Sequence, residues 1–244
     1  MLIFYLLILT VGLFQLAHSN HPHGPHGPNG HHQRHPHQPN PHKGEKQWVY
    51  MPAQGWDMQY NKGVWNFLDV IPLERIRIAA IGSVLTRSYG PPNSTILDVG
   101  CGEGILSEYL TPDQRKNYIG VDISNAAIAR AEKNRGGPMQ WVVAASHQYT
   151  PPFFMDFIIF SEVLYYVEFE KVLKQYEQYL TPTGKIIISL FHPEGKKETY
   201  QDIIKFADSH FKQLDRFEMS GYSGKNWVTI RLLVYEKRPQ PAQR

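Results

Sequence analysis

Short apolar runs alternate with amphipathic stretches through the middle of the chain. The runs are rich in valine, isoleucine and phenylalanine and are bounded by glycine, proline or polar residues, as is typical of buried strands. Five strands are expected at about Ile96–Val99, Tyr118–Val121, Gln140–Ala144, Asp156–Phe160 and Lys185–Leu190. Stretches with apolar residues three or four apart predict helices between them. The alternation predicts a mainly parallel sheet with helices on both faces.

Residues that commonly begin and end helices delimit the predicted ones. Pro72 opens a helix pattern that Gly90-Pro91-Pro92 ends, and Ser124 is a good N-cap for a helix over Ala126–Asn134. The other predicted helices cover about Gly104–Leu110, Phe169–Leu180 and Lys197–Ser209, with Thr181–Gly184 as a turn. The expected apolar face of the first helix comprises Leu73, Ile76, Ile78, Ala79, Ile81, Val84 and Leu85. Two strands, about Phe211–Phe217 and Val228–Tyr235, then end the pattern without a helix between them.

The beginning of the chain predicts a secretory signal peptide over residues 1–19. Leu2 to Ala17 is almost continuously apolar and carries no charge, and Ala17-His18-Ser19 resembles a cleavage site before Asn20. Because the segment has no Lys or Arg before its apolar run, an uncleaved signal anchor is the alternative. The sequence therefore predicts a secreted or secretory-pathway protein with no stable membrane span after cleavage. Asn93-Ser94-Thr95 is a glycosylation sequon, so a glycoprotein is expected.

Residues 20–44 form a histidine- and proline-rich segment, which precedes one domain expected over 45–244. The segment holds eight of the twelve histidines and has no apolar face, so it cannot form a core. It is interpreted either as a disordered spacer or as a weak site for divalent metal, with no ligands assigned. A net charge of +3 without long runs argues against a nucleic-acid partner. Cys101 is the single cysteine, which excludes an intramolecular disulfide.

The segment with the clearest chemistry runs from the first predicted strand into a glycine-rich turn. Its sequence is Asp98-Val99-Gly100-Cys101-Gly102-Glu103-Gly104. Glycines at this position let a nucleotide-like ligand approach the backbone, and the spacing differs from the G-x-G-x-x-G of dinucleotide sites. A carboxylate before the glycines suits a cationic amine. Asp122 ends the next strand, 22 residues after Gly100, which is about where an acid meets ribose hydroxyls.

At these residues the chain resembles the class I S-adenosylmethionine-dependent methyltransferases, over about residues 56–236. The resemblance implies an α/β Rossmann-like fold with a seven-stranded, mostly parallel sheet and a C-terminal antiparallel hairpin, and S-adenosyl-L-methionine as cofactor. Ser146 stands where relatives often carry an acid near the adenine, and Ser161 follows the fourth strand. The cofactor-binding residues expected from the resemblance are Asp98 near the ammonium, Gly100, Gly102 and Gly104 under the methionine part, Asp122 on the ribose, Ile123 beside the adenine, Ser146 and Ser161.

Three side chains at the carboxyl ends of strands four and five are the candidate catalytic residues. Ligands bind at this edge of open α/β sheets. Glu162 is interpreted either as a base or substrate clamp or as a structural hydrogen-bonding group. Tyr166 is expected to form a wall of the site, and His192 is either a base or a strand-end histidine facing solvent. Aromatic residues over Trp56–Phe67 are expected to form a lid.

These features predict methyl transfer to an oxygen or nitrogen of a small-molecule acceptor. The run Glu162–Tyr166 resembles the nodulation N-methyltransferases, but it is short. Two alternatives remain at this point: a secreted cofactor-binding protein without catalysis, and a metal-binding protein whose histidine tract is the active part. Methyl transfer mainly requires alignment of the nucleophile, so a lid, a wall and cofactor-holding groups are the features to look for.

Overall fold

The computed structural model describes residues 51–193, 198–223 and 226–239. The expected signal peptide (1–19), the histidine-rich segment (20–44) and the first residues of the expected domain lie outside these ranges. Within them, no helix has the length and apolar character needed to cross a membrane.

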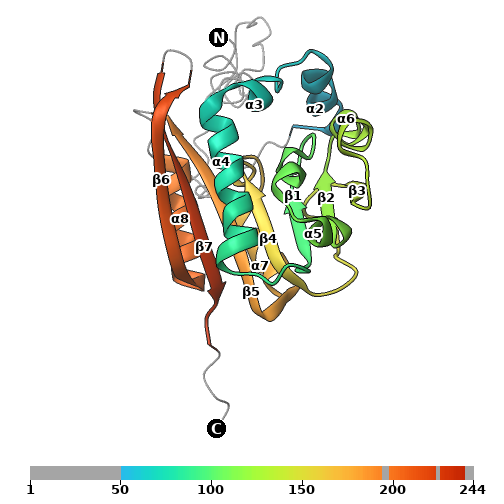
Figure 1. Ribbon diagram of the computed structural model, residues 1–244. Coiled ribbons are helices and arrows are strands. Elements are labelled where there is room, and N and C mark those ends of the chain that lie inside the picture. The colour runs from blue at the N-terminus through green and yellow to red at the C-terminus, as the bar shows by residue number, and fades with distance from the viewer. Residues whose placement is uncertain (1–50, 194–197, 224–225, 240–244) are drawn as a thin grey trace, which may run out of the picture. The chain divides into compact units, whose positions relative to one another are not determined.

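Seven strands form one sheet in the order β3-β2-β1-β4-β5-β7-β6 (Figure 1). Their bounds are β1 Ile96–Val99, β2 Tyr118–Asp122, β3 Gln140–Val143, β4 Met155–Ser161, β5 Leu180–Pro193, β6 Phe211–Ser223 and β7 Asn226–Lys237. The first five pair in parallel, and β7 pairs antiparallel with both β5 and β6. The Rossmann-like sheet with a C-terminal antiparallel hairpin is therefore confirmed. Both hairpin strands are longer than the sequence suggested.

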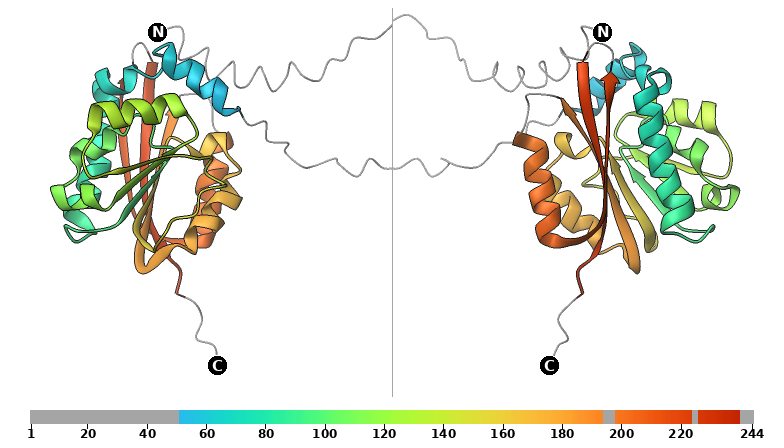
Figure 2. Two further views of the ribbon diagram at one scale, coloured as in Figure 1. Left: turned by 90° about the vertical axis from the view of Figure 1, so that its right-hand side faces the viewer. Right: turned by 60° about the vertical axis from the view of Figure 1, so that its left-hand side comes forward.

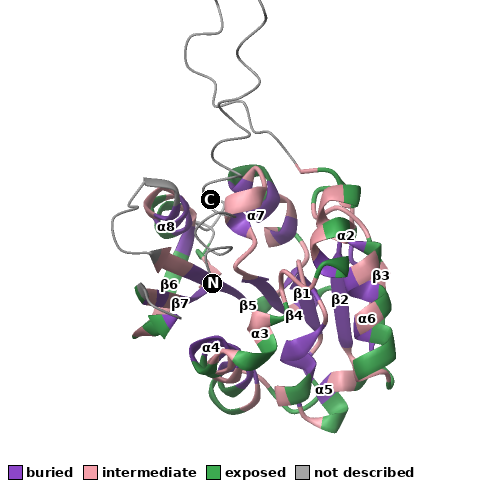
Figure 3. Cartoon of the chain, turned by 90° about the horizontal axis from the view of Figure 1, so that it is seen from above, coloured by how far each residue is buried: buried purple, intermediate pink, exposed green. Residues whose placement is uncertain are grey.

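Helices cover both faces of the sheet. Their bounds are α2 Ala53–Asn61, α3 Phe67–Val70, α4 Pro72–Ser83, α5 Pro112–Lys116, α6 Asn125–Arg135, α7 Phe169–Glu177 and α8 Glu198–His210. In Figures 2 and 3, α4, α5 and α6 lie on one side of the strands, whereas α7 and α8 lie on the other. The strands between these layers are largely buried (Figure 3), and β1 and β2 are buried along their whole length.

The segment after the glycine-rich turn differs from its prediction. The expected helix over Gly104–Leu110 is a 3₁₀ helix, η2 (Ile105–Tyr109), and α5 follows it where only a connection was expected. Gly104 has φ +71 and Leu110 is extended, so only five residues are left for helical turns. Thr111 then caps α5 through a reciprocal capping box with Gln114.

Strand β5 begins earlier than predicted because it contains an irregularity rather than a separate turn. Leu180 pairs with Met155 and Lys185 pairs with Phe157. Residues 181–184 of β5 therefore lie opposite one residue of β4, Asp156, and form a bulge. Helix α7 correspondingly ends at Glu177 rather than Leu180. The expected turn residues are therefore part of a bulged strand start, which leaves the register of the strand's second half intact.

Helix α4 begins at Pro72 as expected, but its buried face differs from the predicted one. Ile76 is 55% exposed, whereas Glu74 and Arg77 are 2% and 3% exposed. The Arg77 Nε donates a 3.0 Å hydrogen bond to Glu74 Oε2, so the two charges are buried as a pair. The helix thus carries an ion pair into the interior at the edge where the strands end.

Candidate active site

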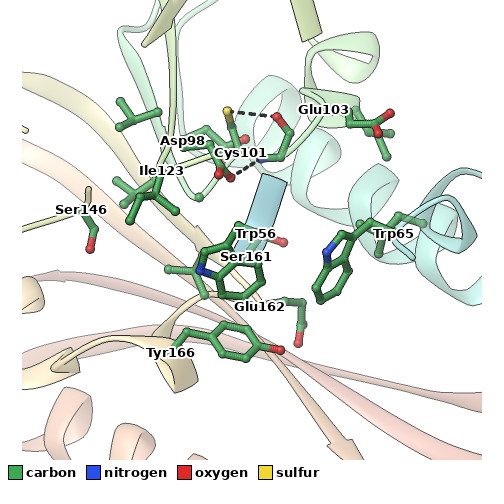
Figure 4. A pocket seen from close by; sticks show the side chains of 18 of the residues that line it. Trp56, Trp65, Asp98, Cys101, Glu103, Ile123, Ser146, Ser161, Glu162 and Tyr166 are labelled. Carbon is green, nitrogen blue, oxygen red and sulfur yellow. Dashed lines mark hydrogen bonds between the residues drawn. The ribbon is translucent and has the colours of Figure 1, made fainter. Parts of the chain in front are cut away.

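A cavity of about 500 Å³ lies at the carboxyl ends of β1, β2 and β4. The glycine-rich turn forms one wall, the segment after β4 forms another, and α2 and α3 contribute a third. The structure brings together here nine of the residues predicted from the sequence: Asp98, Gly100, Gly102, Asp122, Ile123, Ser146, Ser161, Glu162 and Tyr166. Figure 4 shows Asp98 and Cys101 on one side of the cavity and Trp56, Glu162 and Tyr166 on another.

The turn after β1 requires glycine because of both its backbone and its neighbours. Gly100 has φ +75, and an added Cβ would lie 1.9 Å from Cγ2 of Val163. Gly104 does not line the cavity, contrary to its predicted cofactor contact. It begins η2, and its missing side chain makes room for Trp141, whose Cη2 lies 2.2 Å from the position of a Cβ. Gly104 therefore shapes the turn through packing.

Asp98 of β1 is one of the residues that line the cavity. The side chain is buried, and Oδ2 accepts a 2.8 Å hydrogen bond from the hydroxyl of Tyr118. Oδ1 is also buried, yet it has no hydrogen-bond partner among the described residues. Burial raises the pKa of Asp98 to about 7, with Asp122 adding to the rise and Tyr118 opposing it. An unpaired buried carboxylate oxygen is suited to binding a cation.

Asp122 closes the glycine-rich turn against the start of α6. Oδ2 accepts a 2.9 Å bond from the Gly102 N–H, and Oδ1 accepts a 2.8 Å bond from the Ser124 N–H. Ser124 is the N-cap of α6, as predicted. Burial raises the pKa of Asp122 to about 6, although these backbone donors oppose the shift. The carboxylate thus holds the start of α6 and also lines the cavity.

Glu162 follows β4 with a backbone conformation that is unusual for a residue with a side chain. Its φ is +62, which is the left-handed region. Its carboxylate accepts hydrogen bonds from Ser189 Oγ (2.6 Å), the Phe191 N–H (2.7 Å) and the Tyr165 hydroxyl (2.6 Å). Ser189 and Phe191 belong to β5, so these two donors fasten the end of β4 to that strand. The contacts support the structural interpretation of Glu162 over that of a free base.

Aromatic rings form the wall of the cavity opposite the glycine-rich turn (Figure 4). Trp56 of α2 contacts Tyr166 edge to face, with ring centroids 5.1 Å apart, and lies 5.9 Å from Trp65. Burial raises the pKa of Tyr166 above its ordinary value, and the charge of Glu162 adds to the rise. Tyr166 therefore keeps its proton at neutral pH and can donate a hydrogen bond to a ligand. The predicted lid over Trp56–Phe67 does line the cavity.

His192 and Ser146 differ in how well they fit their predicted roles. His192 does not line the cavity; its ring packs on Tyr200 of α8, with centroids 4.1 Å apart and Nε2 3.3 Å from the Tyr200 hydroxyl. The structure therefore gives no support to His192 as the base. Ser146 lines the cavity, and its carbonyl oxygen accepts a 2.8 Å bond from Tyr176, which fixes the segment after β3.

Arg77 is a cavity residue that the sequence analysis missed. Besides Glu74, its guanidinium bonds to Ser161 Oγ, and its Nε lies 4.0 Å from Glu162 Oε1. The predicted cofactor contact Ser161 is thus engaged by Arg77. Helical periodicity classes an arginine beside two isoleucines as a surface residue, so no signal in the sequence placed it in the cavity. A buried guanidinium at this wall suits an anionic group such as a carboxylate.

Asp57 is the second missed residue, and it fastens the lid. Its Oδ1 accepts bonds from Ser124 Oγ (2.7 Å) and the Ala126 N–H (2.9 Å), both at the start of α6. Arg130 of α6 also binds α2 through the Tyr60 carbonyl oxygen and pairs with Glu103 of the glycine-rich turn at 2.7 Å. Helix α2 is therefore attached to the same helix end that Asp122 caps.

A ring of four charges fastens the other part of the lid. Asp69 of α3 pairs with Arg75 (3.0 Å) and Arg135 (3.2 Å), and Glu108 of η2 pairs with the same two arginines at 2.9 and 2.6 Å. The ring joins α3 to α4, η2 and α6. The side chains of Asp69 and Glu108 are 41% and 34% exposed, so the two acids of the ring are accessible to solvent.

Together, the parallel sheet, the glycine-rich turn and the two acids at the ends of β1 and β2 define a Rossmann-like nucleotide-cofactor site. A family model described as a methyltransferase domain matches residues 73–220, and the chain belongs to this family. S-adenosylmethionine is accordingly its cofactor, and the chain is an S-adenosylmethionine-dependent methyltransferase.

Individual relatives agree with this assignment. Nodulation protein S of Rhizobium tropici is 26% identical over 167 residues, which is 64% of this chain and 69% of that protein. The ubiquinone biosynthesis O-methyltransferase of Photorhabdus laumondii is 29% identical over 131 residues, 51% of this chain and 54% of that one. The crystal structure of the N-methyltransferase NodS from Bradyrhizobium japonicum with S-adenosyl-L-homocysteine has a TM-score of 0.57, with 22% identity. It covers 70% of this chain and 91% of NodS, and shows the same fold.

The residues at the cavity fit this cofactor. The unpaired Asp98 Oδ1 can accept from the methionyl ammonium, and Asp122 lies at the end of β2, where ribose hydroxyls bind. Arg77 adds a buried positive charge to the lining, although its guanidinium is already bonded to Glu74 and Ser161, and Ile123 can pack beside the adenine. Bound S-adenosylmethionine supplies an activated methyl group on a sulfonium. The protein's own part is to hold that group, exclude water with Trp56 and Trp65, and orient the acceptor.

Proposed function

We propose that this protein methylates an oxygen or nitrogen of a small-molecule acceptor. The observation that carries the proposal is a continuous cavity of about 500 Å³ that joins the cofactor residues to the aromatic wall of Trp56, Trp65 and Tyr166. Such a volume is within the range of pockets that enclose small molecules. Residues of α2 and α3 line this cavity together with the glycine-rich turn, which favours an acceptor small enough to be enclosed beside the cofactor.

The chemistry of the acceptor follows from what the wall can offer. Tyr166 can donate a hydrogen bond to an acceptor oxygen or nitrogen, and the indole rings supply a flat apolar surface. Since Glu162 is occupied by three protein donors, catalysis depends chiefly on alignment and on exclusion of water. The relatives named above as N- and O-methyltransferases support both acceptor atoms and do not choose between them.

We further propose that the protein acts in the secretory pathway. The apolar first 19 residues motivate this proposal, and Asn93 of the sequon is exposed in a loop before β1, where an oligosaccharide can be attached. The test is expression in a eukaryotic host, followed by sequencing of the mature N-terminus and treatment with an endoglycosidase. An N-terminus at Asn20 and a mass shift that Asn93→Gln removes are expected. An intact Met1 terminus with no oligosaccharide contradicts this part of the proposal.

The function itself is tested with an acceptor screen. The purified full chain is incubated with S-adenosylmethionine and a panel of phenols, catechols, amines, amino sugars and heteroaromatic N–H compounds, and S-adenosylhomocysteine release is measured. We expect turnover with at least one class, lost in Asp98→Ala and retained in Asp113→Ala, an exposed acid paired with Lys116 on α5. Mass spectrometry of the product identifies the methylated atom. Tight cofactor binding without turnover of any class contradicts the proposal.

A further inference from the structure

Tyr118 is a buried tyrosine behind the cofactor site that does not itself line the cavity. It is the first residue of β2, pairs with Ile96 in the parallel register, and is 0% exposed. Its ring extends along the sheet to Asp98, two residues further along β1, where the hydroxyl lies 2.8 Å from Oδ2. A buried hydroxyl in this position satisfies one oxygen of a buried carboxylate.

This contact determines which part of Asp98 is available to a ligand. With Oδ2 bonded to Tyr118, the second oxygen, Oδ1, is the one that has no partner among the described residues. A carboxylate bonded at one oxygen has a fixed rotation about its last side-chain bond, so its free oxygen has a fixed direction. Tyr118 therefore orients the acid without touching the ligand.

Tyr118 is itself held in place by a second aromatic ring. Trp141 of β3 packs edge to face on it, with ring centroids 5.4 Å apart. The Trp141 ring occupies the space that a Cβ would fill at two glycines: its atoms lie 2.2 Å from the Cβ position of Gly104 and 2.7 Å from that of Gly120. The glycine-rich turn, Trp141 and Tyr118 thus form one packed unit that ends at Asp98.

We propose that Tyr118 is a positioning residue for the cofactor: it holds the Asp98 carboxylate with Oδ1 directed at the cavity and stabilises its charged form, so that the site binds the methionyl ammonium near neutral pH. The proposal concerns the cofactor alone and does not depend on which acceptor is methylated. Its failure and the failure of the proposed acceptor chemistry are therefore separate results.

The electrostatic surroundings of Asp98 make this role measurable. The groups that face it are Tyr118 and Asp122 on β2, Arg77 on α4 and Cys101 in the turn. Burial and Asp122 raise the pKa of Asp98, whereas the hydrogen bond from Tyr118 and the charge of Arg77 lower it; the result is about 7. Removing the Tyr118 hydroxyl takes away one of the two groups that favour the carboxylate, so the pKa rises further.

The experiment compares the wild-type protein with Tyr118→Phe by calorimetric titration of S-adenosylmethionine between pH 6 and 9. The methionyl ammonium itself loses its proton at about pH 8, so the two proteins are compared at each pH, where this titration is common to both. The contribution of Asp98 to affinity should rise with pH, with a midpoint near the Asp98 pKa of about 7. In the variant we expect the midpoint to move upward by about one pH unit. Affinity at pH 7 then falls about fivefold, because the ionised fraction falls from about one half to about one eleventh. At pH 9 the two proteins should differ by less than about twofold.

Tyr235→Phe is the matched control. Tyr235 is equally buried, and its hydroxyl donates a 2.8 Å bond to an aspartate, Asp208, between β7 and α8 and outside the cavity lining. Loss of this buried tyrosine hydroxyl should lower thermal stability without moving the midpoint of binding. A merely structural role for Tyr118 predicts the same behaviour for both variants.

A second readout uses the protein without cofactor. With tyrosine labelled at ¹³Cζ, the Tyr118 resonance should shift with a midpoint near pH 7, and this step should be absent in Asp98→Asn, which also assigns the signal. This measurement remains available if Tyr118→Phe does not fold. An unchanged binding midpoint in folded Tyr118→Phe, or no tyrosine signal that depends on Asp98, overturns the proposal.

Discussion

Replacing Asp57 with alanine tests whether α2 closes the cofactor site. The Asp57 carboxylate makes both of its hydrogen bonds to the start of α6, to Ser124 Oγ and to the Ala126 N–H. It also interacts favourably with the positive end of the α6 dipole. The substitution removes the two bonds and this charge, while the Arg130 contacts to Tyr60 and Glu103 remain.

The magnitude follows from these contacts. Loss of an N-cap acceptor costs about 1 kcal/mol, and a bond to a charged group is worth about 1.5–3 kcal/mol before water replaces it. Asp57 is partly exposed, so water recovers part of the loss. We therefore expect the closed position of α2 to be destabilised by about 1–2 kcal/mol. If the cofactor can leave only when α2 opens, its dissociation rate rises about 5- to 30-fold.

Stopped-flow fluorescence measures this directly, because Trp56 and Trp65 lie in the lid. The cofactor is displaced with excess S-adenosylhomocysteine, and the dissociation rate should carry most of the change. Asp113→Ala, which removes an exposed acid from α5, is the control and should behave as the wild type. A dissociation rate within twofold of the wild-type value in folded Asp57→Ala refutes the reasoning, as it shows that the lid contact does not retain the ligand.

Three further predictions follow from the site. Asp98 has a folded pKa of about 7, above the ordinary 3.8, so the empty protein binds more protons than the unfolded chain between these values and loses stability as pH rises through about 4 to 8. Asp98→Asn should therefore be about 4 kcal/mol more stable than the wild type in urea at pH 8, and equal stability contradicts this. Glu162→Gln should lower stability by about 2–3 kcal/mol in urea, because the amide group of the new glutamine would face the Phe191 N–H. The pH profile of kcat should stay unchanged, and loss of its acidic or alkaline limb would instead identify Glu162 as a base. Gly104→Ala should cost about 2–5 kcal/mol, from the left-handed backbone and the contact with Trp141, and a melting temperature equal to that of wild type would show that the turn adapts.

The strands were predictable because burial on both faces requires a continuous run of apolar residues, which is easily recognised in the sequence. β1, β2 and β4 lie within a residue or two of their expected bounds, since polar residues, glycine or proline flank each apolar run. The glycines and acids of the turn were predictable for a similar reason: backbone conformation and ligand approach restrict these positions to a few residue types. Helix ends near Leu110 and Leu180 were not, because they depend on local hydrogen bonding and register.

The residues that the sequence did not reveal are polar side chains with distant partners. Arg77 is buried because Glu74, Ser161 and Glu162 surround it, and Ser161 and Glu162 follow more than eighty residues later. Asp57 looks like any surface acid on α2 until Ser124 is found beside it. His192 is the opposite case, a residue predicted from the sequence to be catalytic that packs elsewhere. Its position at a strand end suggested a base, but Tyr200 of α8 packs against its ring. Tertiary contacts of this kind leave no periodicity in the chain.

The two fastenings of the lid respond differently to dissolved salt. The ring of Asp69, Arg75, Glu108 and Arg135 is accessible to ions, and at physiological ionic strength the screening length is about 8 Å, so added salt weakens it. The Asp57 bonds to the start of α6 are short-range hydrogen bonds and are affected much less. As ionic strength rises, we therefore expect α3 to loosen before α2, so that the cofactor site opens first on the α3 side while the Asp57 contacts still hold α2 closed.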